Sequence, residues 1–380
     1  MKMNISKIAI IAAAAASLMI VGCTPEDTGK NSVTNQINDN TNDSSTPKST
    51  DNSTGNKITP DITTSEDAVK LTVADGEDIT LDSAGTYIIS GTAKDSSIIV
   101  DASKKDEVHL VLDGLNITNK NRPCIHIKKA DRAFITIAEG SSELSVTGDF
   151  EKNDKANADA VIFSKGDLIL GGDGELTISS THHGITSKDG IFVTDGTIRI
   201  TCKGCAFEAH DAIEIDDGII DIAECYDGLH ADKEKDETIG HVYINGGQIN
   251  ISAVDDAIHA TTEVRIGGGE IILTGAEGIE GTVITVNDGT IDIAAKDDGI
   301  NAAHKADNMN PVYEQNGGTV TIKMPNGDTD GLDSNGDIIM NGGTLDITGP
   351  HTFDCDGRAV YNGGTIIENG RKTYSITIKP

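Results

Sequence analysis

Two short runs of sequence decide the fold: Asn287-Asp288-Gly289-Thr290-Ile291-Asp292-Ile293 and, shortly after it, Asp298-Gly299-Ile300-Asn301. In the first run, a turn pair is followed by alternating apolar residues, which is typical of a strand with one buried face. Asn-Gly and Asp-Gly pairs readily adopt the positive φ that tight corners need. The two runs therefore predict a strand, a corner and a second strand.

Both runs recur after residue 159, with a spacing of about 22 residues where no insertion intervenes. The first returns at Asp195, Asp216, Asn245, Gly267, Asn316, Asn341 and Asn362, and the second at Asp227, Asp256, Gly278 and Asp330. A repeat of three short strands cannot bury a core alone, so the repeats must stack. Stacking equivalent strands in one direction gives three parallel sheets. The sequence therefore predicts an all-β fold, a right-handed parallel β-helix (solenoid) of three-strand coils.

The segment before these repeats, residues 66–148, has the same density of strands with looser spacing, as in Val108–Leu112 and Phe134–Ile137. We interpret it as the first coils and the N-terminal cap of the same solenoid. A separate β-sandwich is the alternative. The solenoid domain is predicted to span residues 65–380.

The N-terminus predicts export and lipid anchoring. Lys2 and Lys7 flank the start of an apolar stretch, residues 8–21, that is short for a membrane span and typical of a signal peptide. It ends at Gly22-Cys23, which resembles a bacterial lipobox, so residues 1–23 are predicted to be a lipoprotein signal peptide with Cys23 as the lipidated residue. Residues 24–64 are rich in Ser, Thr and Asn and predict a disordered tether. We expect the protein to be lipid-anchored on the extracellular face of the cell membrane.

Composition limits the partners. The chain has a formal net charge of −31, so it repels nucleic acid and anionic membrane surfaces and favours cations, neutral ligands or anions bridged by cations. Five cysteines remain after Cys23: Cys124, Cys202, Cys205, Cys225 and Cys355. An odd count leaves at least one free thiol, and we favour free thiols over a redox or metal motif at Cys202–Cys205. A local disulfide with Cys225 is the alternative.

Stacking turns each repeat position into a ladder on the surface. The position after the first strand's leading apolar residue reads, coil by coil, Thr186, Glu208, His230, His259, Glu280, Asn301 and Asp333. The turn before it reads His183, Cys205, Asp227, Asp256, Glu277, Asp298 and Asp330. Carboxylates on adjacent rungs lie about 5 Å apart, which is costly unless a cation sits between them. Ca²⁺ accepts six to eight oxygen ligands in loose geometry, so Ca²⁺ is the predicted cofactor, with Asp227, Asp255, Asp256, Asp297, Asp298, Asp328, Asp330 and Asp333 as its ligands.

A glycan-binding surface is predicted at one corner of the coils. Two insertions, Asp232–Gly240 and Ala303–Pro311, fall between the first and second strands of their coils, and insertions in solenoids often mark the binding face. Between them we expect a floor of His259, Arg265 and Glu280. The candidate carbohydrate-binding residues are His230, His259, Arg265, Glu280 and Asn301, with Phe192 and Tyr243 as outward-facing rings for stacking. The His230–His259 pair could instead bind a transition metal.

The repeats, together with Gly184-Ile185 ahead of Lys188-Asp189-Gly190-Ile191, resemble one bacterial family over roughly residues 66–370. It is the carbohydrate-binding β-helix family that binds cellulose and acidic pectin-type sugars, is similar in fold to pectate lyases and carries calcium. The resemblance implies non-catalytic polysaccharide binding at the cell surface. Cys205 replaces the acidic turn of its coil and Glu277 lacks a doubled Asp, so calcium is not expected at those two coils.

Two other functions remain open. A calcium-dependent lyase acting on uronate polymers would use Lys233, Arg265 or Lys305 as its base, although none sits in a recognisable catalytic motif. A surface adhesin or scaffold for a protein partner is the other. We expect a non-catalytic monomer whose partners are a polysaccharide, cellulose or polygalacturonate-like, and the membrane through its lipid, with no nucleic acid.

Overall fold

The computed structural model describes residues 67–151, 157–233, 236–327 and 329–378. The regular elements in these ranges are strands, β1 to β36, and the ranges contain no α-helix. Accordingly, no helix within them could cross a membrane. The predicted signal peptide with Cys23, the predicted tether and Asp328 lie outside the described residues.

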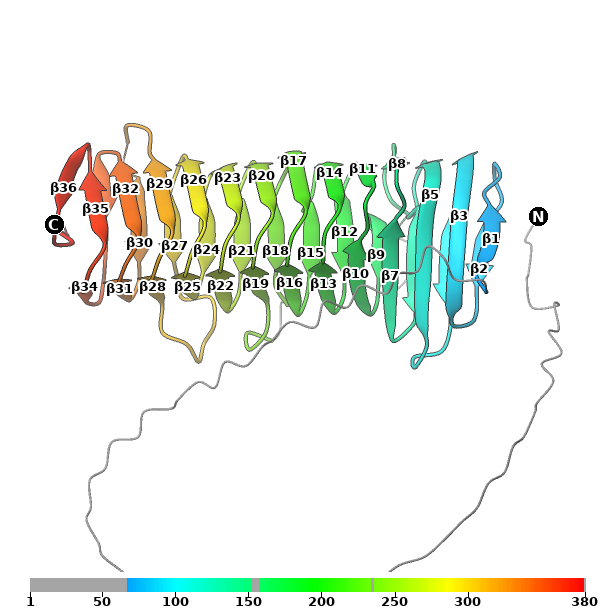
Figure 1. Cartoon of the computed structure of the whole chain (residues 1–380), viewed down its shortest axis with the longest axis horizontal. Helices are drawn as coiled ribbons and strands as arrows, with labels where there is room; N and C mark the ends of the chain where they lie inside the picture. The colour runs from blue at the N-terminus through cyan, green and yellow to red at the C-terminus, as the bar shows by residue number, and fades with distance from the viewer. Residues whose placement is uncertain (1–66, 152–156, 234–235, 328, 379–380) are drawn as a thin grey trace, which may run out of the picture. The chain divides into compact units, whose positions relative to one another are not determined.

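One sheet holds twelve strands, the first of each coil, and we call it the first-strand sheet. Its members are β2 (Ile79–Leu81), β4 (Ile98–Asp101), β6 (Ile125–Lys129), β9 (Ala160–Ser164), β12 (His183–Ser187), β15 (Phe207–Ala209), β18 (Leu229–Ala231), β21 (Ile258–Ala260), β24 (Ile279–Gly281), β27 (Ile300–Ala302), β30 (Asp330–Ser334) and β33 (His351–Phe353). Figure 1 shows these short strands side by side in chain order.

The remaining strands form two further ladders. The second strands are β7 (Arg132–Ile137), β10 (Asp167–Gly171), β13 (Gly190–Val193), β16 (Ala212–Ile215), β19 (His241–Ile244), β22 (Glu263–Ile266), β25 (Val283–Val286), β28 (Val312–Gln315), β31 (Asp337–Met340) and β34 (Ala359–Tyr361). The third strands are β8 (Ser141–Val146), β11 (Glu175–Ser179), β14 (Thr197–Thr201), β17 (Ile219–Cys225), β20 (Gln248–Ala253), β23 (Glu270–Gly275), β26 (Thr290–Ala295), β29 (Thr319–Lys323), β32 (Thr344–Thr348) and β35 (Thr365–Glu368).

Long strands near the N-terminus join the two ladders into a single 24-stranded sheet. β1 (Val69–Thr72) pairs with β3 (Gly85–Lys94), which pairs with β5 (Glu107–Asn119), and β5 then pairs with both β7 and β8. Each pairing between the named strands is parallel except that of the last strand, β36 (Arg371–Thr373), which is antiparallel to β35. The fold is therefore all-β with parallel sheets, and from β9 onward each coil contributes three strands, as the repeats predict.

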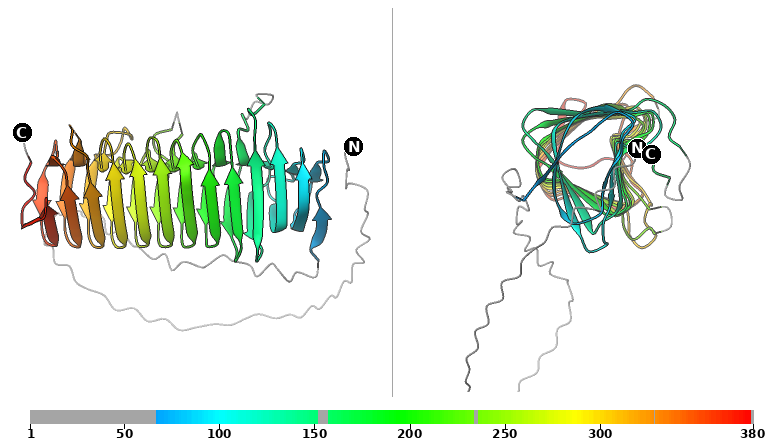
Figure 2. Two further views of the ribbon diagram at one scale, coloured as in Figure 1. Left: turned by 90° about the horizontal axis from the view of Figure 1, so that it is seen from above. Right: turned by 90° about the vertical axis from the view of Figure 1, so that its right-hand side faces the viewer.

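Alternation along each strand places aliphatic residues inside the stack, seen end-on in the right panel of Figure 2. In the second-strand ladder, Val242, Val264 and Ile284 are fully buried and follow one another in register. Short aliphatic chains fill such layers, which is consistent with a composition that is only 3% aromatic. Because the inward positions are used for packing, chemistry is confined to the outward positions and the corners.

The corner before each third strand requires glycine. Gly289 has a φ of +102°, and a Cβ there would lie 3.0 Å from the carbonyl carbon of Gly268 in the preceding coil. A residue with a Cβ would be strained in this left-handed backbone conformation and would also lie too close to the preceding coil. This steric requirement explains why the turn pair recurs and keeps the coils in register.

Candidate functional site

The outward side chains of the first-strand sheet form the predicted ladder. Register pairs Thr186 with Glu208, Glu208 with His230, His230 with His259, His259 with Glu280, Glu280 with Asn301, and Asn301 with Asp333. The predicted order is thus confirmed rung by rung. We call this series the first-strand ladder. Thr186 and Glu280 are buried, whereas the other five ladder residues are half-buried.

The centre of the ladder is a network of charged groups. Nδ1 of His259 lies 3.0 Å from Oδ2 of Asp256 and 2.7 Å from Oε2 of Glu280. Oε1 of Glu280 lies 2.6 Å from Nζ of Lys305, which comes from the insertion Ala303–Pro311. Glu280 is 6% exposed, so these charges interact with little water between them.

The pKa values of this network follow from its contacts. Burial alone would lower the pKa of His259, but hydrogen bonds and charges from Asp256 and Glu280 raise it to about 9. Burial alone would raise the pKa of Glu280, but His259 and Lys305 lower it to about 2. At neutral pH, His259 is therefore an imidazolium that faces ionised Glu280.

One coil earlier, a second His faces a different set of groups. Nδ1 of His230 lies 3.1 Å from Oδ2 of Asp227, outside the alignment of a hydrogen bond, and Sγ of Cys205 lies 3.5 Å from the same oxygen. The rings of His230 and His259 stack with centroids 4.6 Å apart. The predicted His pair therefore exists, but each His is attached to its own Asp.

Towards the C-terminus most of the titratable groups on and beside the ladder are carboxylates. Burial and the charges of Glu280 and Asp256 raise the pKa of Glu277 to about 8, although Nδ2 of Asn301 donates to its carboxylate. Burial raises the pKa of Asp298 to about 6, and the nearby carboxylates of Asp333, Asp297 and Asp330 act in the same direction. The pKa of Asp333 is also raised to about 6, by burial and by Asp354, Asp330 and Asp356. Among the described residues, no ion pair joins Asp298 or Asp333 to a basic side chain, and the neighbouring carboxylates repel one another.

The other predicted calcium ligands are less closely grouped. Asp330 donates its backbone N–H to Oδ1 of Asp298 at 3.2 Å, and Asp256 makes the same contact with Asp227. Asp297 is exposed, and Asp255 is half-buried beside Tyr226. The seven predicted ligands that the structure describes therefore do not form one site. They are distributed over four coils.

The two insertions occupy equivalent corners, as predicted. Asp232–Gly240 joins β18 to β19, and Ala303–Pro311 joins β27 to β28. The two intervening coils turn this corner with short connections that contain Thr261 and Thr282. The C-terminal insertion also lines a depression of about 510 Å³, to which His304, Asn310 and Arg358 contribute.

Arg265 does not lie on the expected floor with His259 and Glu280. It belongs to β22 in the larger sheet, because the chain turns the corner after β21. Its guanidinium lies 3.8 Å from the ring centroid of Tyr243, and no hydrogen bond or ion pair joins it to another described side chain. Tyr243 is half-buried, and its hydroxyl donates to Glu263 at 2.6 Å. One face of this ring is therefore covered by Arg265, whereas Phe192 is outward and half-buried.

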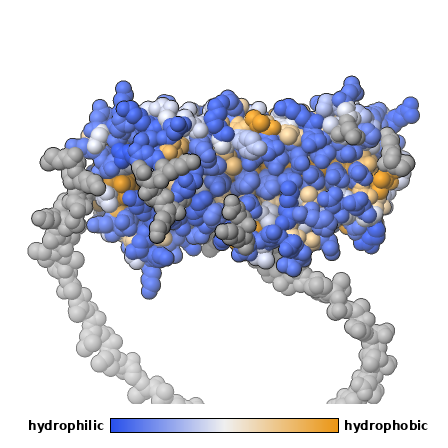
Figure 3. Space-filling model, turned by 180° about the vertical axis from the view of Figure 1, so that it is seen from behind, coloured by the Kyte–Doolittle hydropathy of each residue, from blue (hydrophilic) through white to orange (hydrophobic). Residues whose placement is uncertain are grey.

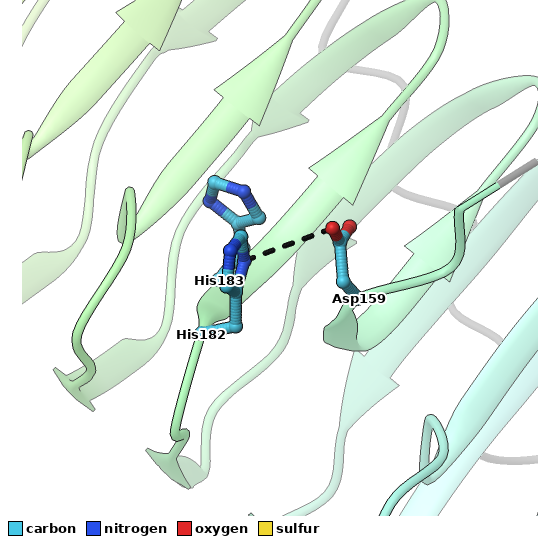
Figure 4. Close-up of side chains that lie close together, drawn as sticks. All are labelled: Asp159, His182 and His183. Atoms are coloured by element: carbon cyan, nitrogen blue, oxygen red, sulfur yellow. Dashed lines mark ion pairs between the residues drawn. The ribbon is translucent and has the colours of Figure 1, made fainter. Parts of the chain in front are cut away.

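A third cluster lies at the corner before β12. Figure 4 shows His182 and His183 beside Asp159, and Nδ1 of His182 lies 3.8 Å from Oδ2 of Asp159. Nδ1 of His183 accepts the backbone N–H of Cys205 at 2.9 Å. Burial lowers the pKa of His183, so the ring is neutral and carries its proton on Nε2.

Sequence reasoning named Lys305 only as a candidate lyase base and missed its contact with Glu280, and it did not expect calcium at the coils of Cys205 and Glu277. The grouping of Cys205 with Asp227 and His230 had a signal in the sequence. Asp-x-x-His occurs at Asp227–His230 and again at Asp256–His259, and both spacings bring the two side chains together. Much of the surface between such clusters is hydrophilic, as Figure 3 shows for one face.

Comparison with known proteins identifies the family. Residues 75–310 match the family model described as carbohydrate-binding domain-containing protein. The chain belongs to this carbohydrate-binding domain family. A protein of the same description from Acetivibrio thermocellus is 30% identical over 273 residues, which are 71% of this chain and 91% of that protein.

A solved structure is also similar to this carbohydrate-binding domain protein. It is that of the polysaccharide lyase-like protein from C. thermocellum, determined as a gadolinium derivative. The TM-score is 0.50 at 25% sequence identity, and the match covers 67% of this chain and 96% of the other. The likeness therefore includes a polysaccharide lyase-like fold as well as the carbohydrate-binding family.

Proposed function

We propose that this protein binds a plant cell-wall polysaccharide without cleaving it, while it is held by lipid on the extracellular face of the cell membrane. Membership of the carbohydrate-binding domain family supports the ligand class. The acidic, pectin-type glycans are the preferred ligands, with cellulose as the neutral alternative. We further propose that the coils wind as a right-handed β-helix, because crossovers between parallel strands of one sheet are almost always right-handed.

The observation that carries the preference for an acidic glycan is the state of Arg265. In a chain of net charge −31, its guanidinium is held against Tyr243 and has no carboxylate partner among the described residues. Arginine binds carboxylates through two parallel hydrogen bonds, which suits the carboxylate of a uronate sugar. The cation–π contact holds the side chain without consuming its N–H donors.

The surroundings of Arg265 are suited to an extended ligand. It lies in the coil after the insertion Asp232–Gly240 and two coils before the insertion Ala303–Pro311. At about 4.8 Å per coil, the insertions stand roughly 14 Å apart, enough for a glycan segment to lie between them. His230, His259, Glu280 and Asn301 would face such a ligand from the first-strand side of the same corner.

The test is a matched pair of charge-removing variants. R265A should weaken binding to polygalacturonate by about tenfold or more, because it removes a charge-assisted bidentate contact. R199A is the control, since Arg199 is a half-exposed arginine on the third strands that already pairs with Glu175 and Asp221. Binding should be measured by calorimetry or affinity electrophoresis, with cellulose as the uncharged ligand. Equal affinities for R265A and R199A, with the fold intact, would remove Arg265 from the site.

Calcium is proposed for the acidic end of the ladder. Asp298 and Asp333 are partly buried, and the charges acting on them are carboxylates. Ca²⁺ prefers several carboxylate and carbonyl oxygens at loosely defined angles, which this part of the ladder provides. The network at Glu280 fits calcium less well, because His259 and Lys305 already neutralise it.

Lipid anchoring is proposed from the Gly22-Cys23 sequence after the apolar stretch. A diacylated N-terminal cysteine supplies two buried chains, enough for stable anchoring. Replacing Cys23 by Ala should release the protein from the membrane fraction. An unchanged membrane fraction would reject Cys23 as the lipidated residue.

The lyase alternative meets an obstacle at its best-placed base. Burial would lower the pKa of Lys305, but its hydrogen bond and charge interaction with Glu280 raise it. A general base must be deprotonated near the working pH, so a raised pKa works against this role. Lys233 lies 3.5 Å from Oδ1 of Asp211 and forms an ion pair with it. Incubation with polygalacturonate should give no ultraviolet absorbance from unsaturated uronate.

A further inference from the structure

One corner of the ladder carries a thiol where the coils that follow carry carboxylates. Cys205 occupies the turn position that Asp227 fills one coil later, and Ala206 donates its N–H to the carbonyl of Asp227 at 2.9 Å. His230 lies three residues after Asp227, on the outward position of β18. A soft sulfur, an imidazole and a carboxylate thus meet at a point where the repeat otherwise supplies oxygen alone.

We propose that Cys205, Asp227 and His230 form a binding site for one divalent transition-metal ion of the zinc type, separate from the acidic end of the ladder. The set of ligands decides the class of ion. Thiolate and imidazole suit Zn²⁺ and Co²⁺, whereas Ca²⁺ requires hard oxygens.

Two of the three distances between the ligand atoms already match those of a tetrahedral site. Sγ of Cys205 and Nδ1 of His230 lie 3.5 Å and 3.1 Å from Oδ2 of Asp227, and the three ligand atoms lie within 4.8 Å of one another. With Zn–S bonds of about 2.3 Å and Zn–N or Zn–O bonds of about 2.0–2.1 Å, neighbouring ligands of a tetrahedral ion stand roughly 3.3–3.6 Å apart. An ion can therefore enter with only small movements of the side chains.

The imidazole of His230 provides an independent indication. Its Nδ1 is buried and makes no well-aligned hydrogen bond to a described residue, although Oδ2 of Asp227 lies 3.1 Å away. A buried polar atom without a well-formed hydrogen bond is costly, and coordination of an ion by its lone pair would satisfy it. One contact holds each of two ligand side chains in place. His259 stacks on the ring of His230, and the backbone N–H of Asp256 donates to Oδ1 of Asp227.

The two similar clusters lack a free ligand position. At Asp256, His259 and Glu280, the imidazole is protonated and Lys305 supplies another positive charge, so this network is neutralised by its own side chains. At Asp159, His182 and His183, Nδ1 of His183 accepts a backbone N–H and its Nε2 carries the proton. Neither His259 nor His183 offers a lone pair to an ion in these states.

Binding must release one proton. Burial and the charges of Asp227 and Glu208 raise the pKa of Cys205, so the group at neutral pH is a thiol whose hydrogen points to Asp227. The ion replaces that hydrogen on sulfur and the proton leaves to solvent, while the Asp227 carboxylate and the His230 imidazole complete the protein ligands. Affinity should therefore rise with pH. The side chain of His230 is 24% exposed, which leaves the fourth position open to water.

Cobalt is the optical probe for this site. Co²⁺ added to the purified protein should bind once per chain with a thiolate-to-cobalt charge-transfer absorption, and Zn²⁺ should displace it. C205S should abolish this absorption and weaken zinc binding by more than about tenfold. C225S is the matched control, because Cys225 is also a buried free thiol and its Sγ lies near the carbonyl of Ser252, at 3.6 Å. Its absorption should equal that of the wild type.

A second variant keeps the test decisive if C205S fails to fold. H230Q retains the thiol and should also weaken cobalt binding by more than about tenfold. Circular dichroism of each variant checks the fold. Absence of the charge-transfer absorption in the wild type, its persistence in C205S, or unchanged affinity in H230Q would each overturn the site. None of these results depends on glycan binding.

Discussion

His230 and His259 stack on neighbouring strands with ring centroids 4.6 Å apart and an interplanar angle of 10°. The backbone around them is the same, and each His lies about 3 Å from an Asp three residues earlier. The two histidines differ in their contact with Glu280, which lies one coil further along. Glu280 forms an ion pair with His259 but not with His230. In a stacked fold, the chemistry of a side chain is therefore set by the next coil as much as by its own sequence.

The Glu280 network should contribute strongly to stability. Glu280→Gln keeps the shape of the side chain but leaves His259 and Lys305 without their shared acceptor charge. Breaking a buried ion pair in this way costs about 3 kcal/mol in the free energy of unfolding. E224Q is the control, because Glu224 pairs with Lys203 at the exposed surface, where such pairs contribute less than about 1 kcal/mol. Urea denaturation measures both, and equal losses would contradict a special role for Glu280.

The same network predicts a pH dependence of known sign. His259 has a pKa of about 9 in the folded protein, against an ordinary pKa of 6.5, so its stabilising effect is complete below about 6.5. That contribution should be lost as the pH rises from about 6.5 to about 9. An NMR titration of the imidazole would measure the shifted pKa directly, and in E280Q the value should move back towards 6.5. A wild-type His259 that titrates near 6.5 would contradict the network.

Reduction should have no effect on stability. Cys124, Cys202, Cys205, Cys225 and Cys355 are all free thiols in the structure. No covalent cross-link then constrains the unfolded chain, so a reducing agent has nothing to remove. Melting curves with and without dithiothreitol should coincide. A clear drop in melting temperature on reduction would instead indicate a disulfide, with Cys225 as the first partner to examine.

Much of the site could be predicted because the repeat fixes the register. Once the coils stack, a residue's place in its repeat determines which residues lie above and below it, so the order from Glu208 to Asp333 follows from spacing alone. The stacking of Arg265 on Tyr243 follows the same rule, since they are neighbours on the second strands. The contact could therefore be predicted from the order of the outward residues on the second strands.

Other features could not be obtained from the repeat. Lys305 lies in an insertion whose path no other coil repeats, so its contact with Glu280 has no periodic signal. The expected floor placed Arg265 beside His259 because they are close in sequence, but the corner at Thr261 directs them onto different sheets. The Cys205 cluster joins Cys205 and Asp227, from the turn position of the repeat, to His230, from the outward position of the first strand. A comparison of residues at one repeat position does not predict contacts between two different positions.

Calcium should raise the melting temperature through the acidic end of the ladder. An ion bound only by the folded protein stabilises it by about 2.7 kcal/mol when its concentration is 100 times the dissociation constant. D333N should lose most of this shift, whereas D292N, which removes an exposed carboxylate from the third strands, should retain it. Thermal melting over a calcium series, with a chelator as the reference, measures the effect. An unchanged wild-type midpoint would reject the calcium assignment.

Without calcium, the same carboxylates should make the protein more stable in mild acid. Asp298 and Asp333 have pKa values of about 6 in the folded protein, above the ordinary aspartate pKa of 3.8, so between these limits the folded state binds more protons than the unfolded state. Stability therefore falls as the pH rises through this window, because ionised neighbours repel one another. Bound calcium keeps both carboxylates ionised and should remove their contribution to the slope. Denaturant midpoints between pH 4 and pH 6.5, measured with chelator and with calcium, should show the slope in chelator and its reduction in calcium. The double variant D298N/D333N should show a smaller slope in chelator than the wild type, with Glu277 carrying part of what remains, and its slope should not change on adding calcium. A wild type whose slope is identical with and without calcium would place the ion elsewhere.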